Sequence, residues 1–120
     1  MNKKQESVAA SKSIEFSVRV VNLYRHLCDE HKEFVMSKQL LRSGTSIGAN
    51  IHEAEYAQSK ADFIAKMFIA LKEASETEYW LQVLKRTDYL TQGEYESIVA
   101  DCIEMLKILT AIVKTAKSNK

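Results

Sequence analysis

The chain has 120 residues and a formal net charge of +1, and it is 46% hydrophobic and 28% charged. This length suits one domain, and the nearly balanced charge differs from the basic bulk that is typical of nucleic-acid binders. There is no proline and there are only three glycines, which predicts an all-α protein, since these residues punctuate strands and tight turns.

The first predicted helix covers about residues 7–29, where apolar residues recur at helical spacing along two neighbouring lines. One line contains Ile14 and Val18, and the other contains Phe16 and Val20. A helix that only lines a four-helix core needs one apolar stripe. The first helix therefore carries surplus apolar surface, which indicates a partner.

The second predicted helix covers about residues 36–58 and contains two glycines, Gly44 and Gly48, four residues apart. Each glycine costs about 1 kcal/mol relative to alanine in a helix interior. One interpretation is that they make room for a large side chain on another helix, such as Phe68 or Trp80. The other is that the helix is kinked there, and the two interpretations are compatible.

The third predicted helix covers about residues 60–86 and begins after Ser59, which with Asp62 forms an N-cap signature. Its middle is apolar nearly all round, beyond what one core stripe requires. This surplus predicts an oligomer interface, for which the candidates are Phe63, Ile69, Trp80 and Val83.

The fourth predicted helix covers about residues 92–117 and begins with a capping box formed by Thr91 and Glu94. Its apolar residues alternate three and four apart, as in a coiled-coil seam: Tyr95, Ile98, Cys102, Met105, Leu109, Ile112 and Ala116. Four long helices joined by short connections predict a single antiparallel up-down-up-down four-helix bundle.

The segment LRSGTSIGANIHEAE, residues 41–55, resembles the hallmark of the four-helix-bundle proteins encoded in intervening sequences of bacterial 23S rRNA genes. That pattern has an arginine, one or two small residues, Ser-Ile-Pro-Ala-Asn-Ile, a variable residue and then Glu-Gly. The matching residues here are Arg42, Ser46, Ile47, Ala49, Asn50, Ile51 and Glu53. Downstream, SKADF resembles the family's Ser-Lys-x-Asp-Phe, and Ser75 with Glu78 resembles its Ala-x-x-Ser-x-x-Glu segment.

Two positions depart from the family pattern. Gly48 stands where the family commonly has proline, and Ala54 stands where it commonly has glycine. Proline cannot donate a helical hydrogen bond. A position that accepts either proline or glycine therefore favours a kink in the second helix at Gly48. The missing second glycine predicts that the second helix continues to Gln58.

The resemblance implies a non-enzymatic bundle that assembles as a ring, often a pentamer. The chain is also similar to the accessory variability protein of diversity-generating retroelements, a bundle associated with nucleic acid and a reverse transcriptase. We therefore expect a homo-oligomer with RNA or DNA as a candidate partner.

Binding of RNA or DNA through backbone charge is the leading functional hypothesis, because a ring repeats the basic patch of each subunit. The candidate contacts are Arg19, Arg25, Lys38, Arg42, Lys66, Lys72, Lys85 and Arg86, with the lysines near the C-terminus. The sequence shows no aromatic-rich basic strand that predicts base stacking. The alternative is a protein–protein adaptor without a nucleic-acid role.

Polar residues on the predicted stripes need partners if they face inward. We expect four of them to cross-link the second and third helices: Asn50, Glu53, Ser75 and Glu78. No third group completes a catalytic site around their carboxylates. A further alternative is a metal-independent ribonuclease, in which Arg19 holds a phosphate and His26 moves a proton.

Metal and cofactor sites are not predicted. No histidine has a glutamate three residues before it, so the ligand spacing of di-iron bundles is missing. We expect Cys28 and Cys102 to lie about 10 Å apart along the bundle axis, too far for a disulfide. No apolar run approaches the length of a membrane span and the N-terminus lacks a signal-peptide core, which predicts a cytoplasmic protein.

Overall fold

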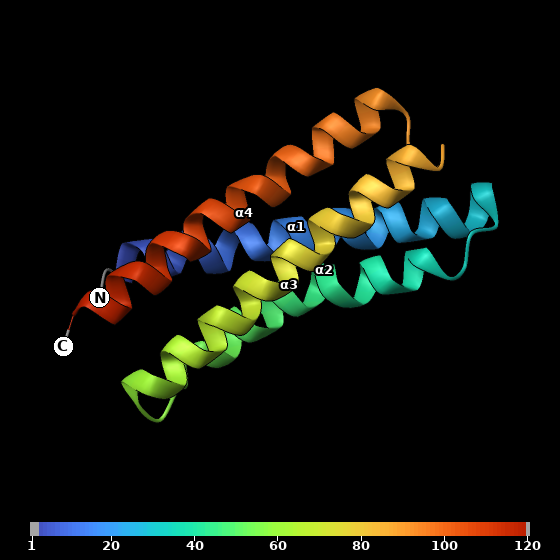
Figure 1. Ribbon diagram of the computed structural model, residues 1–120. Helices are drawn as coiled ribbons and strands as arrows, with labels where there is room; N and C mark the ends of the chain where they lie inside the picture. The colour runs from blue at the N-terminus through green and yellow to red at the C-terminus, as the bar shows by residue number, and fades with distance from the viewer. Residues whose placement is uncertain (1–2, 120) are drawn as a thin grey trace.

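The computed structural model describes residues 3–119, which form four helices in chain order: α1 (Lys3–His31), α2 (Met36–Ala54), α3 (Lys60–Arg86) and α4 (Gln92–Ser118). Consecutive helices run antiparallel and pack side by side, and α4 closes the bundle against α1 (Figure 1). The prediction of an all-α up-down-up-down four-helix bundle is confirmed. The bundle measures 48 × 22 × 19 Å. None of the described helices is long and apolar enough to cross a membrane.

The predicted starts of α3 and α4 are confirmed by their caps. The Ser59 side chain accepts a hydrogen bond from the Asp62 N–H at 3.0 Å. At α4, the Glu94 N–H donates to the Thr91 hydroxyl at 3.1 Å and the Thr91 N–H donates to the Glu94 carboxylate at 2.8 Å. Both caps satisfy N–H groups that have no partner within the helix.

The predicted continuation of α2 to Gln58 is wrong, since α2 ends at Ala54. The N–H groups of Tyr56 and Ala57 donate to the carbonyls of Glu53 and Ala54 at 3.0 and 3.2 Å, which closes the helix in a turn. Ser59 then caps α3 with extended backbone angles. The chain reverses here without a glycine, and Ala54, the last residue of α2, is buried in the core.

The helix α1 is longer than predicted at both ends. Its C-terminal end is set by Lys32, which adopts a positive φ of 53°. The Glu33 N–H donates to the Leu27 carbonyl at 3.0 Å, so the chain folds back onto the last turn of α1.

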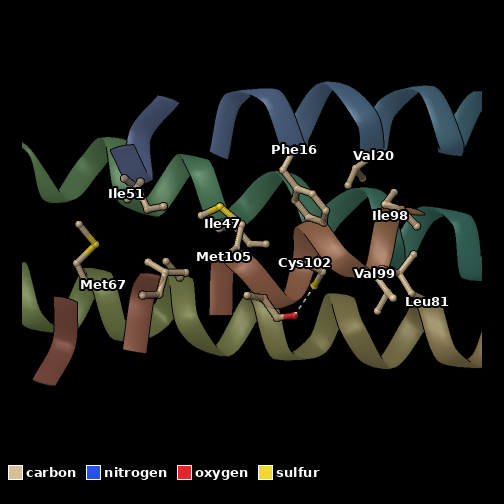
Figure 2. Close-up of a cluster of buried hydrophobic side chains, with 14 of the residues drawn as sticks. Phe16, Val20, Ile47, Ile51, Met67, Leu81, Ile98, Val99, Cys102 and Met105 are labelled. Carbon is tan, nitrogen blue, oxygen red and sulfur yellow. Dashed lines mark hydrogen bonds between the residues drawn. The ribbon is translucent and has the colours of Figure 1, made fainter. Parts of the chain in front are cut away.

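The core runs the length of the bundle, and Figure 2 shows one part of it. The predicted seam of α4 is confirmed, since its members from Ile98 to Ala116 are buried and only Tyr95 is half-buried. On α1 the line of Phe16 and Val20 faces the core. The other line faces outward, with Ile14 66% and Val18 55% exposed.

The two glycines of α2 face α1, and not Phe68 or Trp80 as predicted. A Cβ atom on Gly44 would lie 2.7 Å from Val20 Cγ1, and one on Gly48 would lie 3.1 Å from Ser13 Oγ. The glycines therefore allow the backbone of α2 to approach α1 closely. The helix α2 runs without interruption through both positions, so it is not opened there.

Candidate nucleic-acid and subunit interfaces

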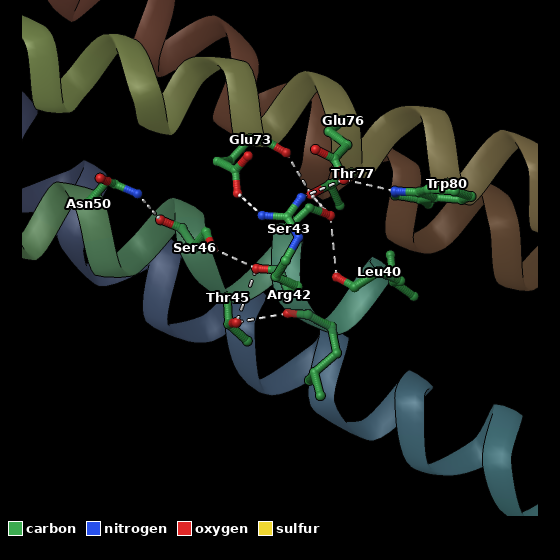
Figure 3. Close-up of polar contacts among 11 residues, drawn as sticks. Leu40, Arg42, Ser43, Thr45, Ser46, Asn50, Glu73, Glu76, Thr77 and Trp80 are labelled. Atoms are coloured by element: carbon green, nitrogen blue, oxygen red, sulfur yellow. Dashed lines mark hydrogen bonds and ion pairs between the residues drawn. The ribbon is translucent and has the colours of Figure 1, made fainter. Parts of the chain in front are cut away.

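The family-like segment of α2 faces α3 and forms a polar cluster around Arg42 (Figure 3). The guanidinium of Arg42 donates to Glu73 at 2.8 Å and to Glu76 at 2.5 Å, both on α3. Glu76 also accepts from the indole N–H of Trp80 at 3.0 Å. The hydrogen bonds from Arg42 and Trp80 lower the pKa of Glu76 below its ordinary value. Arg42 is thus engaged within the bundle as a bridge between two helices.

A second link between α2 and α3 lies beneath this bridge. The hydroxyl of Thr77 lies 2.9 Å from the Ser43 hydroxyl and 2.8 Å from the Glu73 carbonyl. Ser43 and Thr77 are both fully buried. Buried hydroxyl groups need such partners, so this pair fixes how α2 and α3 sit against each other.

The four polar residues predicted to cross-link α2 and α3 are mostly placed elsewhere. Glu53 does link the helices, through an ion pair with Lys66 at 3.1 Å. Asn50 instead donates to the Ser46 carbonyl within α2, and Ser75 is exposed on the outer face of α3. Glu78 is half-buried near Cys102, where burial and this carboxylate raise the pKa of the thiol to about 12.

The polar links that do form were missed from the sequence: Ser43, Glu73, Glu76 and Thr77. One signal was available, because Glu73 and Glu76 are three residues apart and so share a helix face. Nothing in the sequence says that this face meets Arg42, which is about 30 residues away.

Three of the eight candidate nucleic-acid contacts are neutralised by neighbouring acids. Arg42 and Lys66 are paired as described, and Arg19 donates to Asp101 on α4 at 2.6 Å and to the Ser97 carbonyl at 3.1 Å. Within residues 3–119, the other five form no ion pair: Arg25, Lys38, Lys72, Lys85 and Arg86. These cations are the ones available to a phosphate backbone.

The C-terminal half of α4 adds a second set of available cations. Residues 105–119 contain three lysines and no acidic residue, and Lys107, Lys114 and Lys117 are all exposed. The ammonium group of Lys117 lies 5.3 Å from the centre of the Phe68 ring on α3. The basic character of α4 therefore continues onto the neighbouring face of α3.

The large apolar side chains exposed on helices lie on three of them: Val8, Ile14 and Val18 on α1, Phe68, Ile69 and Tyr79 on α3, and Ile103 on α4. A groove of about 450 Å³ between α1 and α4 is lined by Ile14, Phe16, Val18 and Met105, and the Arg19–Asp101 pair crosses it. A second hollow of about 420 Å³ near the start of α1 is lined by Val8, Ile108 and Ala111.

The residues predicted for the oligomer interface on α3 differ in how far they are exposed to solvent. Phe63 is only 5% exposed and belongs to the core of the monomer, so it offers no surface to another subunit. Ile69 is exposed, while Trp80 and Val83 are half-buried. A helix that is apolar on several sides buries only one of them in a four-helix core.

Arg19 and His26 share a further hollow of about 540 Å³ between α1 and α4, together with Glu94. His26 Nε2 lies 3.9 Å from a Glu94 oxygen. The guanidinium of Arg19 already contacts Asp101 and Ser97, so a phosphate bound there would compete with these groups.

The positions of the possible metal ligands and of the two cysteine thiols are also defined by the structure. Over the part of the chain that the structure describes, no group of three or more His, Cys, Asp or Glu side chains is arranged to hold a metal ion. Cys28 and Cys102 are both free thiols. Cys102 is buried and donates to the Ala74 carbonyl at 3.3 Å (Figure 2), whereas Cys28 is half-buried near Ser37.

Comparison with known proteins identifies a matching family and a similar solved structure. The family model of the 23S rRNA-intervening sequence protein matches residues 5–111. A crystal structure of a protein of unknown function from the S23 ribosomal protein family of Bacteroides thetaiotaomicron is 64% identical, with a TM-score of 0.91, over 92% of this chain and 98% of that chain. No curated protein matches the sequence.

Proposed function

The chain belongs to the family of 23S rRNA-intervening sequence proteins, and from this premise we propose that it is a non-enzymatic, self-associating bundle that binds RNA or DNA through backbone charge. The observation that carries the proposal is the set of exposed cations without acidic partners. It comprises Arg25, Lys38, Lys72 and Arg86 among the candidate contacts, together with the lysines of α4 within residues 105–119. Unpaired cations gain most from phosphate contacts, because binding releases condensed counterions without breaking an ion pair.

Self-association is supported by the exposed apolar side chains of α1. Ile14 and Val18 line a groove that contains further apolar side chains, Phe16 and Met105, together with charged ones. Such a patch is typical of protein–protein contacts. We propose the groove between α1 and α4 as the subunit contact of a ring, with a pentamer as the expected assembly. A ring would repeat the cations of each subunit and strengthen weak contacts through multivalency.

The test combines an electrophoretic mobility shift of labelled structured RNA and duplex DNA, at low and high salt, with light scattering of the free protein. We expect an oligomer whose binding weakens steeply as salt rises. The variant K107Q/K114Q/K117Q should lose most of this binding. The matched control Arg42→Gln should retain it, because Arg42 is already held by Glu73 and Glu76.

An oligomer that binds neither nucleic acid at low salt would overturn the proposal in favour of the protein–protein adaptor. A monomer would remove the ring and with it the multivalent argument. RNA cleavage that is lost in His26→Ala would support the ribonuclease alternative. That alternative is weakened by the engagement of Arg19 with Asp101 and Ser97.

A further inference from the structure

The outer face of α3 carries aromatic and cationic side chains in alternation. Residues three, four or seven apart share one face of a helix, and the structure places five such residues on the solvent side of α3. We call this set the α3 ridge: Phe68, Lys72, Ser75, Tyr79 and Arg86. It extends for about 27 Å along the helix.

The acidic residues of α3 near the middle of the ridge point away from it. Glu73 and Glu76 are turned toward α2, where Arg42 bridges them (Figure 3). Glu78 is half-buried and acts on Cys102 of α4. The ridge itself contains no carboxylate, and its two cations, Lys72 and Arg86, have no ion-pair partner within the described chain.

The two rings of the α3 ridge are open to solvent. Phe68 is 43% exposed and Tyr79 is 57% exposed. The ammonium groups of Lys72 and Lys117 lie 6.0 and 5.3 Å from the centre of the Phe68 ring. Because these ammonium groups lie over the ring, a base that stacks on Phe68 would displace them, and their flexible side chains could then reach the adjoining phosphates.

Tyr79 is held in place from one side. Its ring makes an edge contact with Trp80, with 5.0 Å between the ring centres. Trp80 is in turn fixed by its hydrogen bond to Glu76. A ring held in this way loses little conformational freedom when a flat ligand stacks on its open side.

We propose that the α3 ridge is a binding site for single-stranded nucleic acid, with bases stacked on Phe68 and Tyr79 and phosphates held by Lys72, Lys117 and Arg86. This inference rests on the proposed nucleic-acid function and deepens it. Duplexes hide the faces of their bases, whereas single strands expose them to aromatic side chains. The two rings are about 16 Å apart along the helix axis, a span that a short single strand covers.

The site provides its own spectroscopic probe, because Trp80 is the only tryptophan in the sequence and touches Tyr79. Titration of the full chain with oligo(dT) or oligo(U) should change the Trp80 fluorescence. A duplex of matched length should bind more weakly and change this fluorescence less.

Affinities of the variants are best measured by the fluorescence anisotropy of the labelled strands. Phe68→Leu and Tyr79→Leu should each weaken single-strand binding about tenfold and leave duplex binding unchanged. The matched controls are Phe34→Leu and Tyr56→Leu, which alter exposed aromatic residues in the connections between helices. Lys72→Gln should lower the salt dependence by about one phosphate contact. Circular dichroism of each variant checks that the bundle is folded.

The outcomes separate this inference from the proposed function. If single strands and duplexes bind equally well, and the ridge variants bind as the parent chain does, the ridge is overturned while charge-driven binding stands. If no nucleic acid binds at low salt, both fail. If the ridge variants change the mass measured by light scattering and not the affinity, the α3 ridge is a subunit contact and the stacking site is overturned.

Discussion

At the residue scale, Glu33 replaces the capping side chain that α2 lacks. Val35 stands at the N-cap position and provides no side-chain bond. Instead, the Glu33 carboxylate accepts hydrogen bonds from the N–H groups of Val35, Met36 and Ser37 at 3.1, 2.9 and 2.7 Å. Burial raises the pKa of Glu33, but the three backbone hydrogen bonds outweigh it and hold the pKa below its ordinary value. A carboxylate at this position also suits the positive end of the helix dipole.

Glu33→Gln should destabilise the fold by about 1 kcal/mol at neutral pH, since a capping acceptor and its charge are lost. Because the pKa of Glu33 is lower in the folded than in the unfolded state, its contribution is present above the unfolded pKa. It is lost as the pH falls through the folded value. Urea unfolding at neutral and acidic pH should therefore show a smaller acid-induced loss in the variant. The exposed Glu55→Gln is the control, and an equal acid response in Glu33→Gln would refute this role.

The two glycines of α2 should respond differently to alanine. At Gly44 the new Cβ would meet the branched Val20 side chain at 2.7 Å, so overpacking should exceed the gain in helix propensity and cost about 1 to 2 kcal/mol net. At Gly48 the nearest atom is the Ser13 hydroxyl oxygen at 3.1 Å, a milder overlap whose cost should roughly offset the gain in helix propensity, so the change should be close to neutral. Thermal unfolding of both variants tests this order, and a more severe effect at Gly48 would contradict it.

At the element scale, the two sides of the bundle differ in how their helices are joined. The helices α2 and α3 are held by the Arg42 bridge and by the buried contact between Ser43 and Thr77. The ion pairs that link α1 and α4 are exposed or half-exposed, including Lys12 with Glu104 at 3.2 Å. Exposed ion pairs stabilise weakly. The seam between α1 and α4 therefore depends on other contacts, which agrees with its proposed role as a subunit contact.

Thr77→Val tests the buried link between α2 and α3. Valine keeps the shape but leaves the Ser43 hydroxyl with only a long contact to the Leu40 carbonyl at 3.4 Å, so we expect a loss of about 1 kcal/mol or somewhat more. Thr110→Val is a matched control, because Thr110 makes the same bond to the carbonyl four residues earlier but is exposed on α4. Denaturant unfolding gives the free energy of unfolding of both variants. If both lose the same amount, the Ser43 contact contributes nothing to stability.

At the scale of the whole molecule, the outward apolar line of α1 and the α3 ridge lie on two helices that, within the described residues, do not contact each other. The apolar line of α1 borders the groove with α4, whereas the α3 ridge carries two cations that are unpaired within residues 3–119, Lys72 and Arg86. This separation would let the chain assemble through one side and bind nucleic acid through another.

Ile14→Glu combined with Val18→Glu should reduce the mass measured by light scattering, because two charges would be placed in the proposed subunit contact. The monomer should remain folded, since both side chains point to solvent and not into the core. Val35→Glu, which adds a charge in the connection between α1 and α2, is the control. An unchanged mass in the double variant would place the subunit contact elsewhere.

The features that the sequence predicted well are local. The caps at Ser59 and Thr91 depend on side chains three residues apart, and the seam of α4 depends on a regular repeat. The features that it predicted poorly join distant residues, such as the partner of Gly44 or the acids around Arg42. The exposure of Phe68, which is 43%, likewise follows from packing and not from helical spacing.

By itself, the sequence determined the number of helices, the caps of α3 and α4 and the family pattern, because helical periodicity and capping act within a few residues. Only the tertiary structure decided which apolar line of α1 is buried and which cations are already paired. Periodicity fixes which residues share a face of a helix, but the neighbouring helix that meets that face is set by packing across the whole bundle. The proposed function depends on the unpaired cations, and the α3 ridge depends on the exposed rings. Packing of the four helices determines that these side chains remain at the surface.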